Sequence, residues 1–326
     1  MGALFCLLSA VGFGVMAVFG KLAYDAGVSV DALLLVRFGL AAVVLVVVAA
    51  STGAHRALSR RFVLLGLAMG AVGYAAQATF YFSALERLDA SLVALVFYVY
   101  PVLVMAVAVA VGRERASRRR VGALAIALCG IALVLVGATT GRFDGLGALL
   151  ALGSALTYTC YIMVGDRVGA GVPPVALTAL VCTGAFATFL VTGALRGGTD
   201  LRFDPVGWVW LTALALVSTV GAILLFFAGL ARVGPSMAAL LSILEPVVTV
   251  TGAAAVFGER LTPTQWAGGA LVLGAVALVQ WPSRATPAPA AEGLSRSCRS
   301  PDRSCDPAGP HRPSAAAEAA ARRAAP

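Results

Sequence analysis

The stretch PSMAALLSILEPVVTVTGAAAVFG, Pro235–Gly258, is the most informative part of the sequence for the architecture of the protein. It is almost wholly apolar, and as a helix rising about 1.5 Å per residue it is long enough to cross a hydrocarbon core of roughly 30 Å. Its one charged residue, Glu245, falls near the middle of that span. A carboxyl group at the centre of a bilayer costs about 2.5–3.5 kcal/mol on insertion scales, so its presence there indicates a function.

Pro246 directly follows Glu245 and disturbs the predicted helix. A proline nitrogen has no hydrogen to donate to the carbonyl four residues back, here that of Ser242, so the helix tends to kink. Ser242, Glu245 and Thr249 share one face of the helix. A polar face beside a break in the middle of a membrane is what a solute or proton pathway requires.

The whole chain has the composition of a membrane protein. Of its 326 residues, 60% are hydrophobic and 12% are charged, which excludes an ordinary soluble domain. The net charge of +9 does not indicate a nucleic-acid partner, because the basic residues lie in short gaps between apolar stretches and in the C-terminal tail. The six cysteines show no zinc-binding spacing, and we expect no metal or other cofactor.

Ten apolar stretches follow one another, most of them 18 residues or longer. This pattern predicts an all-α polytopic membrane protein with ten transmembrane helices. Residues 282–326 are rich in Pro, Ala, Ser and Arg without apolar periodicity, so we expect a disordered cytoplasmic tail. The ten stretches are residues 2–22, 31–50, 62–85, 90–112, 121–140, 146–165, 174–195, 206–230, 235–258 and 264–281.

The chain repeats itself at a constant offset of 145 residues. One offset that holds without a gap across the apolar stretches predicts a duplicated five-helix unit, residues 1–140 and 141–281. Because five is odd, the second unit enters the membrane from the opposite side. Inverted repeats are the architecture of many secondary transporters, whose binding site lies between the repeats near the midplane. The matches include Ser9-Ala10 with Ser154-Ala155, Arg87 with Arg232, Pro101-Val102 with Pro246-Val247, and Glu114-Arg115 with Glu259-Arg260.

Basic residues in the short loops set the orientation. In the first unit only Lys21 and Arg87 lie on one side, whereas eight arginines lie on the other. In the second unit, the basic loop residues weakly favour the opposite orientation, so the predicted orientation depends on the first unit. We expect a multi-pass protein of the plasma (inner) membrane with both termini in the cytoplasm, on the arginine-rich side. The eight arginines are Arg56, Arg60, Arg61, Arg113, Arg115, Arg118, Arg119 and Arg120.

The fourth helix of each unit carries a mid-helix proline and ends in Glu and a basic residue. The segments are Tyr100-Pro101-Val102 with Glu114-Arg115, and Leu244-Glu245-Pro246-Val247 with Gly258-Glu259-Arg260. This pattern resembles the EamA repeat of the drug/metabolite transporter superfamily, and Val36-Arg37-Phe38 is similar to the family's Arg-Phe pair. The resemblance covers about residues 1–281. It implies ten helices, the inner membrane and transport of small organic metabolites, often by proton-coupled export or exchange. Phe13-Gly14 departs from the Trp-Gly of many members.

Glu245 and Arg37 are the charged candidates for the site. Glu245 could bind a proton on one side of the membrane and release it on the other, or pair with a cationic substrate. The alternative is a structural acid that hydrogen-bonds a neighbouring helix or pairs permanently with Arg37. Arg37 could bind an anionic substrate, lock Glu245, or extend toward the nearer membrane interface.

Aromatic and polar side chains form two stripes, on the third and sixth apolar stretches. Their polar atoms need partners inside a membrane, so we expect both stripes to face inward and line a cavity. The alternative is helix–helix packing with interhelical hydrogen bonds. We expect Pro101 and Pro246 to act as hinges of broken helices. The stripes are Tyr74, Gln77 and Tyr81, and Ser154, Tyr158 and Tyr161, with Tyr98 and Tyr100 flanking Pro101.

Glu114 and Glu259 end their helices beside Arg115 and Arg260. An acid is unfavourable at a helix C-terminus because of the helix dipole, so each needs a cationic partner. A structural clasp is the favoured interpretation.

Together these features predict a secondary transporter for a small organic metabolite, a proton-coupled exporter or exchanger that works by alternating access. A channel is the alternative, disfavoured because the polar residues are sparse and clustered. A membrane-embedded enzyme is weaker still, since no catalytic set such as H-E-x-x-H occurs. The expected partners are a small molecule, protons and the lipid bilayer, not nucleic acid. The substrate, the direction of transport and the oligomeric state, a homodimer included, stay open.

Overall fold

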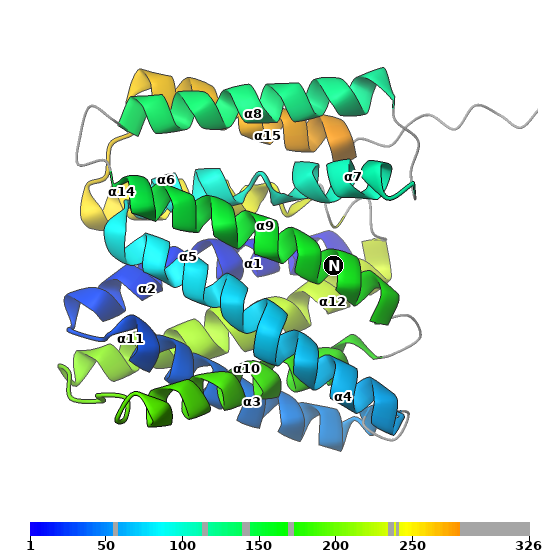
Figure 1. The fold of residues 1–326 in the computed structure, drawn as a ribbon, viewed down its shortest axis with the longest axis vertical. Coiled ribbons are helices and arrows are strands. Elements are labelled where there is room, and N and C mark those ends of the chain that lie inside the picture. The colour runs from blue at the N-terminus through cyan, green and yellow to red at the C-terminus, as the bar shows by residue number, and fades with distance from the viewer. Residues whose placement is uncertain are drawn as a thin grey trace, which may run out of the picture. The chain divides into compact units, whose positions relative to one another are not determined.

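The computed structural model describes residues 1–54, 58–112, 117–138, 144–168, 173–233, 238 and 241–280. They belong to one unit, Met1–Pro282, whereas the predicted tail at residues 282–326 lies outside the described residues. Within the described ranges the secondary structure is helical, without β-strands (Figure 1). The all-α class predicted from the apolar stretches is therefore confirmed.

The first half of the chain contains α1 to α8. The first helical segment is α1 (Gly2–Gly14) with α2 (Met16–Asp25), and the second is α3 (Val30–Ser51). The third joins α4 (Arg60–Ala68), the π turn η2 (Met69–Tyr74) and α5 (Ala75–Arg87). The fourth is α6 (Ala90–Phe97) with α7 (Tyr100–Ala110), and the fifth is α8 (Arg118–Ala138).

The second half has the same order of elements. It begins with α9 (Gly145–Val168) and α10 (Pro174–Leu195). The next segment joins α11 (Val206–Ala215), the π turn η3 (Leu216–Gly221) and α12 (Ala222–Val233). The last two described helices are α14 (Leu244–Phe257) and α15 (Pro263–Gln280). Both halves thus place a π turn in their third segment, and π turns are frequent at functional sites.

Each of the ten apolar stretches contains helix, and seven of the described segments are long and apolar enough to cross a membrane. The exceptions are α8, whose apolar part is shorter, α14 and α15. A multi-pass membrane protein follows from these lengths, whereas the number of ten spans remains a prediction. The seven segments are Gly2–Asp25, Val30–Ser51, Arg60–Arg87, Ala90–Ala110, Gly145–Gly165, Pro174–Leu195 and Val206–Val233.

The two halves pack on each other reciprocally. Helix α1 packs on α12, and α9, the equivalent of α1, packs on α5, the equivalent of α12. One hydrogen bond occurs in both interfaces at the offset of 145 residues. The Ser9 hydroxyl donates to the Ala222 carbonyl over 2.7 Å, and the Ser154 hydroxyl donates to the Gln77 carbonyl over 3.2 Å. The internal repeat therefore extends to single hydrogen bonds.

Equivalent helices run in opposite senses. Lys21, near the end of α2, lies 3.7 Å from Asp89, whereas Asp144, just before α9 begins, lies 3.0 Å from Arg87. Figure 1 shows α2, α11 and α14 reaching this same end of the bundle, on the left, with α4 and α7 toward the opposite end. We call it the ion-pair end, where Lys21, Arg87, Asp89, Asp144 and Glu259 lie. The opposite sense of α2 and α9 is what inverted repeats predict.

Small residues let α10 approach the third segment closely. A Cβ atom on Gly70 would lie 2.0 Å from the Val181 carbonyl oxygen, and one on Gly184 would lie 2.1 Å from that of Leu67. Neither distance leaves room for a side chain, so backbone contacts backbone at this crossing. Such small-residue interfaces are typical of membrane helices, which lack a hydrophobic driving force for association.

Candidate functional site

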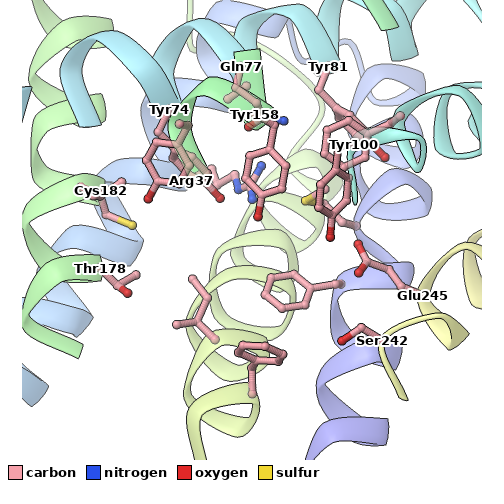
Figure 2. A pocket seen from close by; sticks show the side chains of 18 of the residues that line it. Arg37, Tyr74, Gln77, Tyr81, Tyr100, Tyr158, Thr178, Cys182, Ser242 and Glu245 are labelled. Atoms are coloured by element: carbon pink, nitrogen blue, oxygen red, sulfur yellow. The ribbon is translucent and has the colours of Figure 1, made fainter. Parts of the chain in front are cut away.

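A cavity of about 370 Å³ lies between the two halves of the chain. Residues from α1 through α14 contribute to its wall, and Figure 2 shows many of their side chains pointing into one space. The volume is within the range of small-molecule sites. The lining residues are Phe13, Met16, Arg37, Tyr74, Gln77, Ala78, Tyr81, Phe82, Phe97, Tyr98, Tyr100, Tyr158, Tyr161, Thr178, Val181, Cys182, Ile223, Phe226, Phe227, Ser242 and Glu245.

The wall of the cavity follows the internal repeat. Most of its residues form pairs exactly 145 positions apart, both members of which line the cavity. A cavity built from equivalent positions of both halves lies around the axis that relates them. The pairs are Phe13 and Tyr158, Met16 and Tyr161, Arg37 and Cys182, Ala78 and Ile223, Tyr81 and Phe226, Phe82 and Phe227, Phe97 and Ser242, and Tyr100 and Glu245.

Glu245 lies in the first turn of α14, directly after the break in its helix. Its backbone N–H donates to the Ser242 carbonyl, and its carbonyl accepts a hydrogen bond from Thr249. The carboxyl group lines the cavity (Figure 2) and makes no ion pair or hydrogen bond with another described residue. A carboxyl group in this position is available to a ligand or a proton.

Arg37 lines the same cavity from α3 and is buried. Its Nε donates to the Thr219 hydroxyl over 2.9 Å, and its guanidinium lies between the rings of Phe38 and Phe82, at 5.1 and 5.2 Å from their centroids. Such stacking on aromatic faces holds a guanidinium in place. Arg37 therefore neither reaches a membrane interface nor forms an ion pair with Glu245, which removes two of the alternatives raised by the sequence.

The π turn η3 supplies the partner that positions Arg37. Within η3, the hydroxyl of Thr219 donates to the Leu214 carbonyl, five residues back, while its oxygen accepts the hydrogen bond from Arg37. A regular α-helix would have rotated this hydroxyl to another direction, because one extra residue per turn changes every later side-chain direction. The position of the Arg37 side chain therefore depends on the irregular turn η3.

Tyrosines make most of the aromatic wall. Tyr100 meets Tyr158 edge to face with ring centroids 4.8 Å apart, and Tyr158 stacks on Tyr161 at 5.9 Å. Tyr74 packs against Tyr161 at 5.3 Å, and Tyr81 packs against Phe97 at 5.2 Å. These contacts fix the rings and leave a rigid aromatic surface with hydroxyl groups, suited to a small organic molecule.

The break near Glu245 is held by a residue of the other half. The hydroxyl of Tyr98 donates to the Ser242 carbonyl, the group that Pro246 leaves without its usual helical partner. Tyr98 itself lies in the equivalent break, between α6 and α7 and three residues before Pro101. The two proline-containing helices, predicted as hinges, are therefore joined at their breaks.

Two predicted residues lie outside the cavity. Ser154 is buried between α9 and α5, where it accepts a hydrogen bond from the Gln77 side chain over 3.1 Å. Thr249 is buried against α1, and its hydroxyl donates to the Gly14 carbonyl over 2.7 Å. Both make interhelical hydrogen bonds, which for Ser154 is the alternative to lining a cavity that the sequence left open. Gln77 does both, since it donates to Ser154 and also lines the cavity.

Several lining residues had no signal of their own in the sequence. Thr178, Cys182, Phe226 and Phe227 line the cavity, although none of them belongs to the stripes of polar residues predicted to face inward. The repeat is the signal that could have found two of them. Cys182 is the equivalent of Arg37, and Phe226 is the equivalent of Tyr81.

The chemistry of this site is that of binding. In the described part of the chain no group of three or more His, Cys, Asp or Glu residues is placed to hold a metal ion. The cavity offers one carboxyl group, one guanidinium, tyrosine hydroxyls and an amide among aromatic rings. These groups can hold a small polar molecule by its charges and its apolar part together.

Known proteins are similar to this chain in sequence and in fold. The profile of the EamA-like transporter family matches residues 1–136 and 145–281. An uncharacterized transporter of Archaeoglobus fulgidus is 29% identical over 62% of this chain and 70% of its own length. A probable amino-acid metabolite efflux pump of Salmonella typhimurium is 28% identical over 60% of this chain and 70% of its own.

Two further comparisons are narrower. The threonine/homoserine exporter RhtA of Escherichia coli is 31% identical over 44% of this chain and 47% of its own length. A solved crystal structure at 21% identity superimposes with a TM-score of 0.60 over 85% of this chain and 96% of that one, which shows a shared fold. Since the family profile covers both halves of the chain and most of its length, the chain belongs to the EamA-like transporter family.

Proposed function

We propose that this chain is a proton-coupled secondary transporter that exports or exchanges a small amino-acid metabolite by alternating access. The observation that carries the proposal is the presence of Arg37 and Glu245 in one aromatic cavity without an ion pair between them. Burying two opposite charges apart from each other is costly unless a ligand or proton completes them.

The two charges match the two ends of an amino acid. The planar guanidinium of Arg37 suits a carboxylate, because its donors form a rigid fork. Only its Nε has a described hydrogen-bond partner, so its other nitrogens are available to a ligand. Glu245 suits an ammonium group, and the tyrosines surround the apolar part of the ligand. The names of the Salmonella and Escherichia relatives support this substrate class.

Glu245 also suits the coupling role. A carboxyl group that binds either a substrate cation or a proton links the movement of one to the movement of the other. In our proposal the protein has ten spans in two inverted units, residues 1–140 and 141–281. It lies in the plasma membrane with both termini in the cytoplasm, and the two units rock around the cavity.

The test is transport by purified protein in sealed vesicles with a proton gradient across the membrane. We expect saturable flux of an amino acid such as threonine or homoserine, and movement of protons together with the substrate. Arg37→Met should weaken the competition by carboxylate-bearing compounds and leave that of the matching amines unchanged. Flux that does not saturate and follows voltage alone would indicate a channel and overturn the proposal.

A further inference from the structure

Among the described residues, three ion pairs join the two halves of the chain at the ion-pair end. They connect Lys21 with Glu259 at 3.1 Å, Arg87 with Asp144 at 3.0 Å, and Asp31 with Arg196 at 3.1 Å. The pair of Asp31 and Arg196 is largely in solvent, with 53% and 68% of these side chains exposed, so water screens it. The pair of Lys21 and Glu259 is different, because 7% of the Glu259 side chain is exposed.

Glu259 gathers four donors from two other helical segments. Its Oε1 accepts the Ala90 N–H over 2.9 Å and the Lys21 ammonium over 3.1 Å. Its Oε2 accepts the N–H and the hydroxyl of Ser91 over 3.0 and 2.7 Å. The carboxylate therefore caps the N-terminus of α6 from the other half of the chain, where the helix dipole favours a negative charge.

The protonation of Glu259 follows from these contacts. Burial raises the pKa of its carboxyl group, but the hydrogen bonds from Ser91 and Ala90 and the charge of Lys21 outweigh burial and hold the pKa below its ordinary value. The group is an anion at neutral pH. Lys21 in turn lies 3.7 Å from Asp89, which directly precedes α6, and over the ring of Phe257, the last residue of α14. Lys21 therefore contacts both helices that Glu259 connects.

The part of the cavity wall that α5 and α6 contribute toward this same end is buried. The lining residues Tyr81 and Phe82 lie on α5, which ends at Arg87, and Phe97 lies on α6, which begins after Asp89, and all three are buried. The hydroxyl of Tyr24 donates to the Phe82 carbonyl and ties α2 to this layer. The lining residues of the opposite end, Thr178 and Phe226 among them, are partly exposed. The cavity is therefore more open away from Glu259.

We propose that Lys21, Glu259 and the N-terminus of α6 form a latch that holds the cavity closed at the ion-pair end and must release before the cavity opens there. The latch rests on the proposed alternating-access transport. Lys21 and α6 belong to one half of the chain and Glu259 to the other, so a movement of the halves breaks all four contacts together. Water then replaces the lost donors, which makes the release reversible.

The experiment measures from which side the cavity can be reached. Cys182 lines the cavity and serves as the reporter once the other five cysteines are replaced by serine or alanine. Sealed vesicles of both orientations are treated with a small, membrane-impermeant methanethiosulfonate, and the rate of Cys182 labelling is measured from each side. The variants Glu259→Gln and Lys21→Met are compared with the parent chain, which keeps Cys182 and an intact latch. They are also compared with Asp31→Asn, which breaks the exposed ion pair at the same end.

We expect Glu259→Gln and Lys21→Met to raise labelling from the ion-pair side by about five- to tenfold and to lower it from the other side, the population shift that follows from weakening one closed state. Asp31→Asn should change neither rate by more than about twofold, as for an exposed pair. A variant that only destabilises the fold raises labelling from both sides, which would count against the latch. Unchanged labelling would overturn it.

A covalent bridge between the two halves distinguishes the latch proposal from the transport proposal. Lys21→Cys with Glu259→Cys, joined by a short bifunctional thiol reagent, should stop labelling from the ion-pair side and stop transport, and both should return when a cleavable bridge is cut. Continued transport with the bridge in place would overturn the latch while leaving the transporter intact. Absence of transport by the parent protein, together with side-specific labelling of Cys182, would overturn the transport function and leave the latch.

Discussion

Tyr100 and Glu245 occupy equivalent positions of the two halves, 145 residues apart, and both side chains line one cavity. The same holds for Arg37 and Cys182. The backbone frame of the site is thus nearly symmetric, while its charges are not. The acid and the guanidinium belong to different halves, and a ligand with two different ends is what we propose for this site.

Glu245→Gln should abolish proton-coupled flux, because the amide can neither take up a proton nor neutralise an ammonium group. The protein should still insert and keep its thermal stability within a few degrees. Tyr100→Phe, at the equivalent position, is the matched control and should retain proton coupling. Flux and proton movement in vesicles are the measurements. Full coupled transport by the Gln variant at all pH values would exclude this role.

Arg37→Lys should weaken substrate binding although the charge is kept. A lysine has no planar group to stack between Phe38 and Phe82 and no fork for a carboxylate, so we expect the KM to rise by about tenfold or more. The maximal rate should change less. The measurement is the substrate dependence of flux, and an unchanged KM would place the carboxylate elsewhere.

Tyr98→Phe should loosen the junction of the two broken helices. The variant keeps the ring and removes the hydroxyl that donates to the Ser242 carbonyl, so it should cost about 1 kcal/mol of stability. The Ser242 carbonyl keeps its hydrogen bond from the Glu245 N–H but loses the one that joins the two breaks, so transport should slow as well. Tyr161→Phe, whose hydroxyl has no described hydrogen-bond partner, is the control in a thermal-shift measurement. Equal melting temperatures for the two variants would contradict a specific contribution of this hydrogen bond.

Gly70→Ala should destabilise the packing of α10 on the third segment. A Cβ atom at this position would lie 2.0 Å from the Val181 carbonyl oxygen, so the helices must separate, at a cost of about 1–3 kcal/mol. Gly122→Ala is the control, since a Cβ there has open space within 4 Å and alanine favours a helix. The melting temperature should fall for the first variant and stay level or rise for the second.

Acid should weaken the contact of Glu259. Because the pKa of this carboxyl group is held below its ordinary value of 4.5 in the folded protein, its contribution to stability is present above that pH and is lost as the pH falls through the folded pKa. Lys21 and Asp89 are the charged groups that face it. The drop in melting temperature between pH 6 and about pH 3 should be smaller in Glu259→Gln than in the parent. An identical drop would assign the acid sensitivity to other groups.

Much of the fold could be predicted from the sequence because lipid allows few backbone arrangements. The apolar stretches predicted helices, and the offset of 145 residues predicted the reciprocal packing that the Ser9 and Ser154 hydrogen bonds display. The π turns were not predicted, because a π turn shifts the register by a single residue and leaves no mark in apolar periodicity. The direction of Thr219, and with it the position of Arg37, depends on that shift.

The candidate site was predictable only in part. Polar residues in apolar stretches gave about half of the lining residues, since such groups must find partners inside a membrane. The same rule cannot separate a residue that lines a cavity, such as Tyr158, from one that bonds a neighbouring helix, such as Ser154, because both satisfy it. Apolar lining residues such as Phe226 are indistinguishable by composition from residues that face lipid.

The near-symmetric cavity also has an evolutionary consequence. A homodimer of half-length chains would build a similar pocket, but every substitution would then appear twice, giving two arginines facing each other or two acids. Fusion of the copies into one polypeptide lets each half change alone. A fused chain can therefore acquire a specificity for a dipolar ligand that two identical half-length chains could not encode.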